Sequence, residues 1–275
     1  MPTSPLPTGE GRQKRQSSSR SHDVVRPTGQ PDSGLGLFSV PGEPTDEGGA
    51  MGAIRYFEGG GAVPLLAKAD RRSTVHRRVP LDLAVVPVRD GDAIVGVGVH
   101  AGLWTSEAMT AQVEDVPVLR RLLADLEREF GFDPKGHSGK ALRHAVTSLP
   151  HDLLINLPHE SVKALVVTAM SLADRPRPTL TLSRSILKGH LFAFVWLPRD
   201  ELTTRRRIAI GDMIAKASVG RITNWSVDLG DGDLALVRYT LAVSPQTPDP
   251  DVAELDRRLD AMVRGWEPMV EEALA

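Results

Sequence analysis

Residues 179–243 read TLTLSRSILKGHLFAFVWLPRDELTTRRRIAIGDMIAKASVGRITNWSVDLGDGDLALVRYTLAV, and this stretch decides the fold class. Thr179 to Ser183 alternates hydroxyl and apolar side chains, which is the period of a half-buried strand. A second strand is predicted at His190 to Leu197, where a continuous apolar run has the length of a buried strand. Asp200, a residue type favoured at helix N-caps, then opens a predicted helix that runs to about Ala217.

The second half of this stretch predicts a hairpin. Arg221 to Leu229 and Leu234 to Val243 are strand candidates that pair around a turn containing Gly230. The order strand, strand, helix, strand, strand predicts an α+β fold of antiparallel sheets with helices packed on one face, as in ACT and ferredoxin-like domains. A Rossmann fold would alternate parallel strands with helices. A last helix is predicted after Asp249, with an apolar face of Val252, Leu255, Leu259, Met262 and Trp266.

The chain before residue 179 predicts another hairpin and three helices. Leu81 to Arg89 and Ala93 to Val99 flank a turn at Gly91, and a short strand is expected at Ala62 to Ala67. The helices are expected from Pro117 to the glycine at 131, from Ser138 to Leu149, and from Glu160 to Ala173. The sequence therefore predicts two consecutive small domains joined by helices.

The predicted domain boundaries follow from composition. Residues 1–50 are rich in Pro, Gly and Ser and are expected to be a disordered tail. Residues 51–175 are the first ACT-like domain with its helical extension, and residues 176–245 are the second ACT-like domain. Residues 246–275 are expected to be a helix that leads toward a catalytic domain absent from this chain.

Composition limits the classes of partner. The chain has 275 residues, with 33 Lys and Arg against 35 Asp and Glu, so no field of one sign recruits nucleic acid or an anionic membrane. Cysteine is absent, which excludes disulfides and thiolate metal sites. The longest apolar runs, such as Ala164 to Met170, are too short to span a bilayer, and no secretory signal is visible. The expectation is a cytoplasmic protein that binds neither nucleic acid nor membrane.

Motifs that suggest chemistry each fail at an identifiable residue. Gly96 to Gly102 resembles a dinucleotide loop, but its spacing is wrong and no helix follows. Gly136 to Lys140 resembles the end of a phosphate-binding loop, but Ala141 stands where Ser or Thr would ligate magnesium. His159-Glu160 begins like a zinc-protease helix, but Lys163 stands at the second ligand position, so no metal site is expected.

Basic residues remain as candidate contacts. Two clusters contain them, one around Arg71 and one on the helix after Asp200, and each is usually a solvated surface. Trp104, Trp196 and Trp225 lie on or near predicted strands, where core packing explains them. The candidates for contact with an anion or a partner are Arg71, Arg72, Arg77, Lys140 and Arg207.

An ordered series of short motifs resembles the N-terminal ACT-like regulatory region of the large bacterial NAD-dependent glutamate dehydrogenases. Coverage extends from roughly Leu35 or Met51 to the C-terminus, with a departure at Arg205-Arg206, where an acidic and an apolar residue are expected. The motifs are Lys68–His76 (KADRRSTVH), Leu103–Ser106 (LWTS), Pro117–Arg121 (PVLRR), Gly131–Pro134 (GFDP), His137–Leu142 (HSGKAL), Leu149–Leu153 (LPHDL), Pro198–Asp200 (PRD) and Gly265–Glu267 (GWE).

The resemblance implies an enzyme that oxidises L-glutamate to 2-oxoglutarate and ammonia, with NAD as cofactor of the full-length protein. The substrate pocket and the Rossmann domain of such enzymes lie further along the chain, so no catalytic, cofactor-binding or metal-binding residue is carried over, and this chain is expected to bind no NAD. Implied partners are its own catalytic domain, homo-oligomer contacts and an amino-acid effector.

Two alternatives stay open. One is a free-standing ACT-like module that senses amino acids or mediates an interaction. The other is a self-contained oxidoreductase, which rests on the glycines from Gly96 to Gly102.

Overall fold

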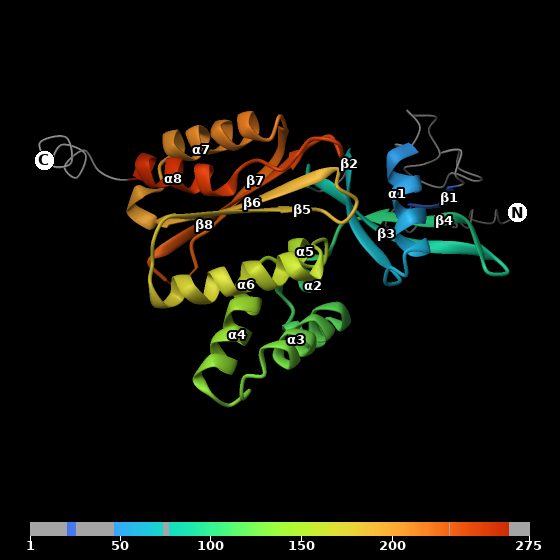
Figure 1. The fold of residues 1–275 in the computed structure, drawn as a ribbon, viewed down its shortest axis with the longest axis horizontal. Coiled ribbons are helices and arrows are strands. Elements are labelled where there is room, and N and C mark those ends of the chain that lie inside the picture. The colour runs from blue at the N-terminus through green and yellow to red at the C-terminus, as the bar shows by residue number, and fades with distance from the viewer. Residues whose placement is uncertain (1–20, 26–46, 74–76, 231, 264–275) are drawn as a thin grey trace, which may run out of the picture.

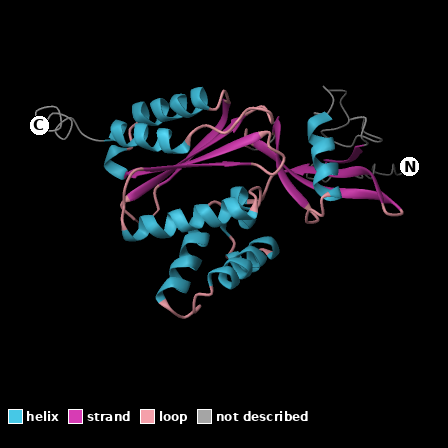
Figure 2. Ribbon diagram, in the orientation of Figure 1, coloured by secondary structure: helices cyan, strands magenta, loops and turns pink. Residues whose placement is uncertain are grey.

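The computed structural model describes residues 21–25, 47–73, 77–230 and 232–263. The chain forms two four-stranded antiparallel sheets, and a helical segment packs on one face of the second sheet. Figure 1 shows the first sheet near the N-terminus, and Figure 2 shows helices on both faces of the second sheet. The expected α+β class with antiparallel ACT-like sheets is confirmed. No helix in the described part of the chain has the length and apolarity needed to cross a membrane.

The first sheet has the strand order β1-β4-β3-β2. Its hairpin of β3 and β4 turns at Gly91, whose φ of 58° is readily adopted by glycine. Helix α1 packs on this sheet and buries Ile54 and Phe57 against Val85 and Val97. The bounds are β1 Ser21–Val25, α1 Glu47–Glu58, β2 Leu65–Arg72, β3 Pro80–Asp90 and β4 Ala93–Gly102.

Two elements of this unit differ from the sequence-based prediction. β1 and the first turn of α1 fall within the segment expected to be disordered, and the rest of that segment lies outside the described residues. β1 joins the sheet by backbone pairing with β4, from Ser21 opposite Ala101 to Val25 opposite Val97. An edge strand held by its backbone shows little apolar periodicity, which is why the pattern did not reveal it.

The helical segment packs on one face of the second sheet. Helix α3 ends at Gly131, which adopts the left-handed conformation and donates from its backbone N–H to the Glu127 carbonyl. Helices α3, α4 and α6 share one buried cluster that includes Leu126, Leu142 and Val166. The bounds are α2 Ser106–Thr110, η2 Val113–Asp115, α3 Pro117–Phe130, α4 His137–Ser148, α5 His151–Leu154 and α6 His159–Asp174.

The second sheet has the order β5-β6-β8-β7 and is covered on both faces. In β6, Leu191, Ala193 and Val195 point into the cluster formed with α7 and α8, whereas Phe192 and Phe194 point into the cluster formed with the helical segment. Burial on both faces explains why β6 reads as a continuous apolar run. The bounds are β5 Thr179–Arg184, β6 His190–Pro198, η3 Arg199–Glu201, α7 Thr204–Ala217, β7 Arg221–Asp228, β8 Leu234–Ala242 and α8 Val252–Val263.

The predicted cap of α7 is wrong. Asp200 lies in the short helix η3, and Thr203 is the N-cap of α7, with its hydroxyl accepting from the Arg206 N–H at 3.1 Å. Both residue types cap helices well, so local sequence did not decide between them. At the other end of the domain, α8 lies along β5, where the Asp256 carboxylate accepts from the Leu180 N–H at 2.7 Å.

Candidate functional site

A cavity of about 270 Å³ lies where α6 crosses the edge strand β5. Alternation along β5 sends Leu180 toward α7 and α8 and sends Thr181 and Ser183 toward α6. The helix contributes Glu160, Ser161, Ala164, Leu165 and Thr168 to the walls of the cavity. The site is therefore built at the junction between the helical segment and the second sheet.

Two hydroxyl groups in the wall of this cavity lack hydrogen-bond partners. Thr181 Oγ1 and Ser183 Oγ are buried atoms without a partner among the described residues, and Ser183 as a whole is 8% exposed. A buried hydroxyl that makes no hydrogen bond costs about 1 to 3 kcal/mol. Both oxygen atoms are buried, so a small molecule in the cavity could hydrogen-bond with them only after a change of side-chain rotamer.

The charge of the cavity restricts what it can bind. Among the described residues that line it, Glu160 is the one charged group, and Ala164 and Leu165 supply apolar surface. A carboxylate at the wall favours a ligand with an ammonium group, and hydroxyls can donate to a ligand carboxylate. The lining thus suits a small zwitterion with a short apolar part.

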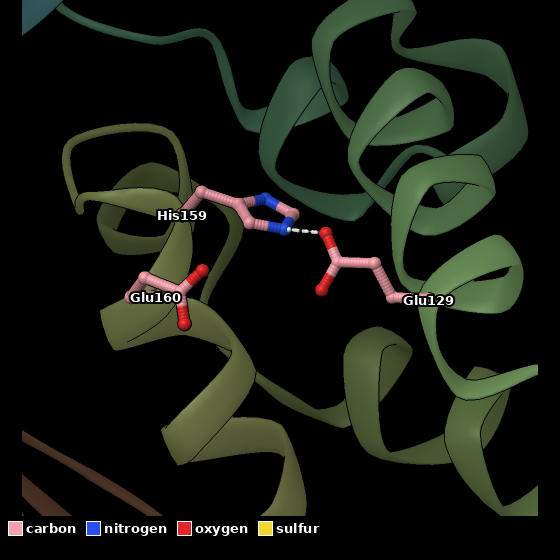
Figure 3. Close-up of side chains that lie close together, drawn as sticks. All are labelled: Glu129, His159 and Glu160. Atoms are coloured by element: carbon pink, nitrogen blue, oxygen red, sulfur yellow. Dashed lines mark hydrogen bonds and ion pairs between the residues drawn. The ribbon is translucent and has the colours of Figure 1, made fainter.

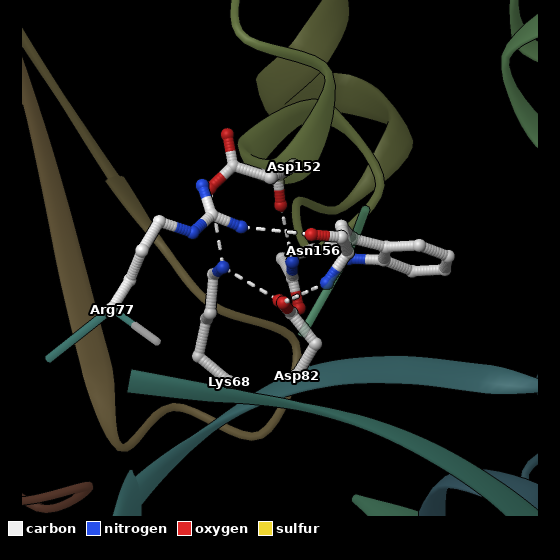
Figure 4. A network of polar contacts seen from close by, with 6 residues as sticks. Lys68, Arg77, Asp82, Asp152 and Asn156 are labelled. Carbon is white, nitrogen blue, oxygen red and sulfur yellow. Dashed lines mark hydrogen bonds and ion pairs between the residues drawn. The ribbon is translucent and has the colours of Figure 1, made fainter. Parts of the chain in front are cut away.

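A second polar site joins the first sheet to the helical segment. Lys68 Nζ lies 2.6 Å from Asp82 Oδ1 and 3.2 Å from Asp152 Oδ2, and the lysine side chain is 8% exposed. Figure 4 shows Lys68 directed toward Asp82 and Asp152. Asp82 also accepts from the Trp104 backbone N–H at 3.2 Å. Burial raises the pKa of Asp82, although the charge of Lys68 opposes this rise. The network ties β2 and β3 to α5.

The basic residues predicted as contacts lie apart. Arg72 is exposed at the end of β2, and Arg71 lies in the same strand with a side chain outside the described part of the structure. Arg77 is exposed and donates to the Trp104 carbonyl at 2.8 Å. Lys140 is exposed on α4, whereas Arg207 belongs to α7 on the opposite face of the second sheet. They therefore do not form one site.

Arg207 makes a contact that the sequence did not predict. Its guanidinium carbon lies 3.7 Å from the centre of the Trp225 ring, and its backbone carbonyl accepts from the Tyr239 hydroxyl at 2.6 Å. The interpretation of Trp225 as a core residue is wrong, because this side chain is 48% exposed on the edge strand β7. Ile208, the next residue after Arg207 in α7, is also 48% exposed. This surface is available to a partner.

A third group of side chains could hold a metal ion. Glu129 at the end of α3 meets His159 and Glu160 in the first turn of α6, and one ligand atom from each lies within 4.8 Å of the others. Figure 3 shows the ring of His159 directed toward the carboxylate of Glu129. Spacing along the sequence had not indicated this cluster, because Glu129 comes from a different helix.

Two family models match this chain, one over the helical segment and one over the second sheet. Residues 116–175 match the family model described as glutamate dehydrogenase, helical motif 1, and residues 180–267 match the one described as glutamate dehydrogenase, ACT2 domain. The first match covers α3 to α6, and the second covers β5 to α8. The cavity lies between the two matched regions.

Three curated relatives carry the name NAD-specific glutamate dehydrogenase. The protein of Pseudomonas aeruginosa is 26% identical over 73% of this chain, and that of Halomonas elongata is 24% identical over 73%. The Mycobacterium tuberculosis protein is 23% identical over 65%. The chain spans only 12%, 12% and 11% of these three relatives. A histidine kinase structure from Erythrobacter litoralis EL346 is 13% identical and covers 82% of this chain and 96% of its own length, but its TM-score of 0.21 does not indicate a shared fold.

Proposed function

Because the chain belongs to the glutamate dehydrogenase family, through its helical motif 1 and its ACT2 domain, we propose that it is a non-catalytic regulatory part of an NAD-dependent glutamate dehydrogenase. The whole enzyme would convert L-glutamate, NAD and water to 2-oxoglutarate, ammonia and NADH in the cytoplasm. Oligomer contacts and contacts with the catalytic domain would then be the partners of this chain. The exposed surface of Trp225 and Ile208 on the second domain is a candidate for such a contact.

A non-catalytic role is supported by the position of the glycine run. Gly96, Gly98 and Gly102 lie within β4, and Val97 and Val99 of the same strand pair with β3. A dinucleotide loop needs a turn that leads from a strand into a helix N-terminus. These glycines lie in a continuous strand instead. The hypothesis of a self-contained oxidoreductase, which rested on them, therefore has no support from this segment.

The regulatory role rests on the cavity between α6 and β5. An effector that hydrogen-bonds with Thr181 and Ser183 and also contacts Glu160 would join the helical segment to the second sheet. If the effector binds one arrangement of the helical segment and the second sheet more tightly than another, it shifts the equilibrium toward the first arrangement. The size of the shift is set by the difference between the two affinities. An amino acid has the groups for this, since its ammonium suits Glu160 and its carboxylate can accept from the two hydroxyls.

The proposed effector is a neutral amino acid with a short apolar side chain. Glutamate would bring a second carboxylate into a cavity whose described lining holds no cation. Isothermal titration of the chain with a panel of amino acids tests this. We expect saturable binding of neutral aliphatic amino acids, an increase in melting temperature on binding, and much weaker binding of glutamate.

Variants connect that binding to the cavity. The double substitution Thr181→Val and Ser183→Ala should abolish the heat of binding. The control Thr147→Val removes a hydroxyl on α4 that bonds to the Arg143 carbonyl at 2.8 Å, away from the cavity, and should bind normally. Absence of binding by every amino acid, or binding unchanged in the double variant, would refute this site. An assay for NADH with glutamate and NAD should show no turnover by the chain alone.

A free-standing sensing module remains the second candidate. The observation that favours it is that each sheet has its own buried cluster, as an independently folding unit requires. Association with a separately produced catalytic region of a relative distinguishes the two. A regulatory part should bind that region and alter its rate of glutamate oxidation, whereas a free-standing module should do neither.

A further inference from the structure

The cluster of Glu129, His159 and Glu160 combines ligand chemistry with access to solvent. His159 Nε2 lies 2.5 Å from Glu129 Oε1, with the two side chains 35% and 34% exposed. The residues come from the last turn of α3 and the first turn of α6, in the helical segment whose helices share a buried cluster. Packing of this segment therefore holds the two groups near one another before any ion binds.

We propose that Glu129, His159 and Glu160 form a binding site for a divalent transition-metal ion, with Zn²⁺ as the best fit. One imidazole nitrogen and two carboxylate oxygens are ligands that zinc accepts, at about 2.0 to 2.2 Å from each ligand atom. Ligand atoms within 4.8 Å of one another need only small side-chain rotations to reach these distances. Water completes the tetrahedral coordination. Magnesium and calcium, which prefer oxygen ligands alone, fit this set less well.

The ion would take the place of a proton. The hydrogen bond between His159 and Glu129 is replaced when the neutral imidazole and the carboxylate both coordinate the ion. The zinc site thus takes two of its ligands from a pair of side chains that already lie in contact.

Lys163 is the group that opposes the ion. Its Nζ lies 2.9 Å from Glu129 Oε2, whereas His159 faces the other oxygen, Oε1. The ion can therefore use Oε1 while Lys163 stays near Oε2. Coulomb repulsion between the ammonium and the ion would weaken binding without preventing it. Removal of this ammonium should accordingly tighten binding, which is a result that a damaged fold would not produce.

Glu129 explains why the zinc-protease motif does not reveal this site. A zinc-protease helix places its second histidine one turn after the first, where this chain has Lys163. Here Glu129 replaces that ligand from a helix that lies 30 residues earlier in the chain. A bound ion would join the end of α3 to the start of α6. Glu160 also lines the neighbouring cavity, so a zinc ion and an effector would share this carboxylate, but the zinc site itself requires no effector.

Titration of the EDTA-treated full chain with ZnCl₂ tests the site. We expect one ion per chain, with magnesium giving no saturable signal. His159→Gln and Glu129→Gln should each weaken zinc binding at least about tenfold. The matched control His137→Gln removes an exposed histidine of α4 and should leave binding unchanged. Titration with Co²⁺, followed by visible absorption, should give a tetrahedral spectrum that is lost in His159→Gln.

Lys163→Met keeps the proposal testable if the ligand variants unfold. This substitution should tighten zinc binding, because it removes the competing ammonium. The proposal is wrong if the folded chain shows no saturable zinc binding, if His159→Gln binds as well as the parent, or if Lys163→Met binds no more tightly. Circular dichroism of each variant separates loss of the ligand from loss of the fold.

Discussion

Gly139 lies against the backbone of Asp133, so closely that a β-carbon at position 139 would stand 2.2 Å from the Asp133 carbonyl oxygen. The glycine belongs to the first turn of α4, and Asp133 lies in the loop that precedes this helix. The stretch from Gly136 to Lys140 resembles a phosphate loop. Its second glycine, Gly139, is needed because the backbone at Asp133 packs closely against α4 there.

Gly139→Ala should destabilise the chain. A methyl group at that position forces the loop away from α4, and overpacking of this kind costs about 1 to 3 kcal/mol. Urea unfolding followed by circular dichroism measures the loss. Gly102→Ala is the control, because a β-carbon there meets no atom within 4 Å. Equal stability of the two variants would contradict the packing role of Gly139.

Lys68→Met should destabilise the junction between the first sheet and α5. The substitution leaves the carboxylates of Asp82 and Asp152, 12% and 21% exposed, without their shared cation. Loss of one partner from a buried ion pair costs about 3 to 5 kcal/mol. Adding Asp82→Asn should recover part of the loss in thermal unfolding. The exposed Lys135→Met is the control and should be near neutral.

The Lys68→Met variant should also regain stability in acid. Burial raises the pKa of Asp82 in the folded state, so the folded state holds its proton at a pH where the unfolded state has lost it. The stability that protonated Asp82 contributes is lost as pH rises. Removal of Lys68, whose charge lowers the pKa of Asp82, makes this loss larger. Unfolding at pH 5 and pH 7 should show a smaller difference from the parent at pH 5. An equal or larger difference at pH 5 would contradict this.

His151 should make the chain less stable in mild acid. Burial lowers the pKa of this imidazole, so the unfolded state binds a proton at a higher pH than the folded state does. Stability is therefore lost as pH falls below the ordinary histidine value of about 6.5. Melting temperatures of His151→Gln should depend less on pH between 7.5 and 5.5 than those of the parent. The exposed His137→Gln should keep the parent's dependence.

Ser183→Ala should raise the stability of the ligand-free chain. The substitution removes a buried hydroxyl that has no partner among the described residues, which relieves a cost of about 1 kcal/mol. Ser148→Ala is the matched control, since the Ser148 hydroxyl donates to the Ala145 carbonyl at 3.0 Å and its loss should lower stability. Chemical denaturation of both variants gives the comparison. A destabilised Ser183→Ala would mean that this hydroxyl has a structural partner.

Arg207 and Trp225 should be coupled energetically. Their contact on the partly exposed face of α7 and β7 is worth about 0.5 to 1 kcal/mol at a site of this kind. A double-mutant cycle of Arg207→Ala and Trp225→Ala measures that coupling in urea unfolding. Arg205→Ala, on the exposed side of the same helix, should show no coupling to Trp225→Ala.

Much of the second domain could be predicted from local sequence. The strands from Thr179 to Ser183 and from His190 to Leu197, and the hairpin around Gly230, agree with β5 to β8 to within a residue or two. Their order identified the antiparallel α+β class. Alternation, apolar runs and turn glycines act over a few residues, so these features are visible without knowledge of distant contacts.

The candidate sites depended on contacts between distant segments. The cavity joins Glu160 of α6 to Ser183 of β5, and the proposed zinc site joins Glu129 to His159 across two helices. The same holds for Lys68, which the sequence places in a charged block and the fold buries beside Asp82 and Asp152.

The sequence by itself determined the α+β class, most strands and helices, and the resemblance to a glutamate dehydrogenase family. Only the tertiary structure decided which polar side chains meet, which of them are buried, and that Gly139 allows the loop at Asp133 to pack closely against α4. The physical reason is that helix and strand preferences come from neighbouring residues, whereas burial and ligand geometry come from side chains that the folded chain brings together.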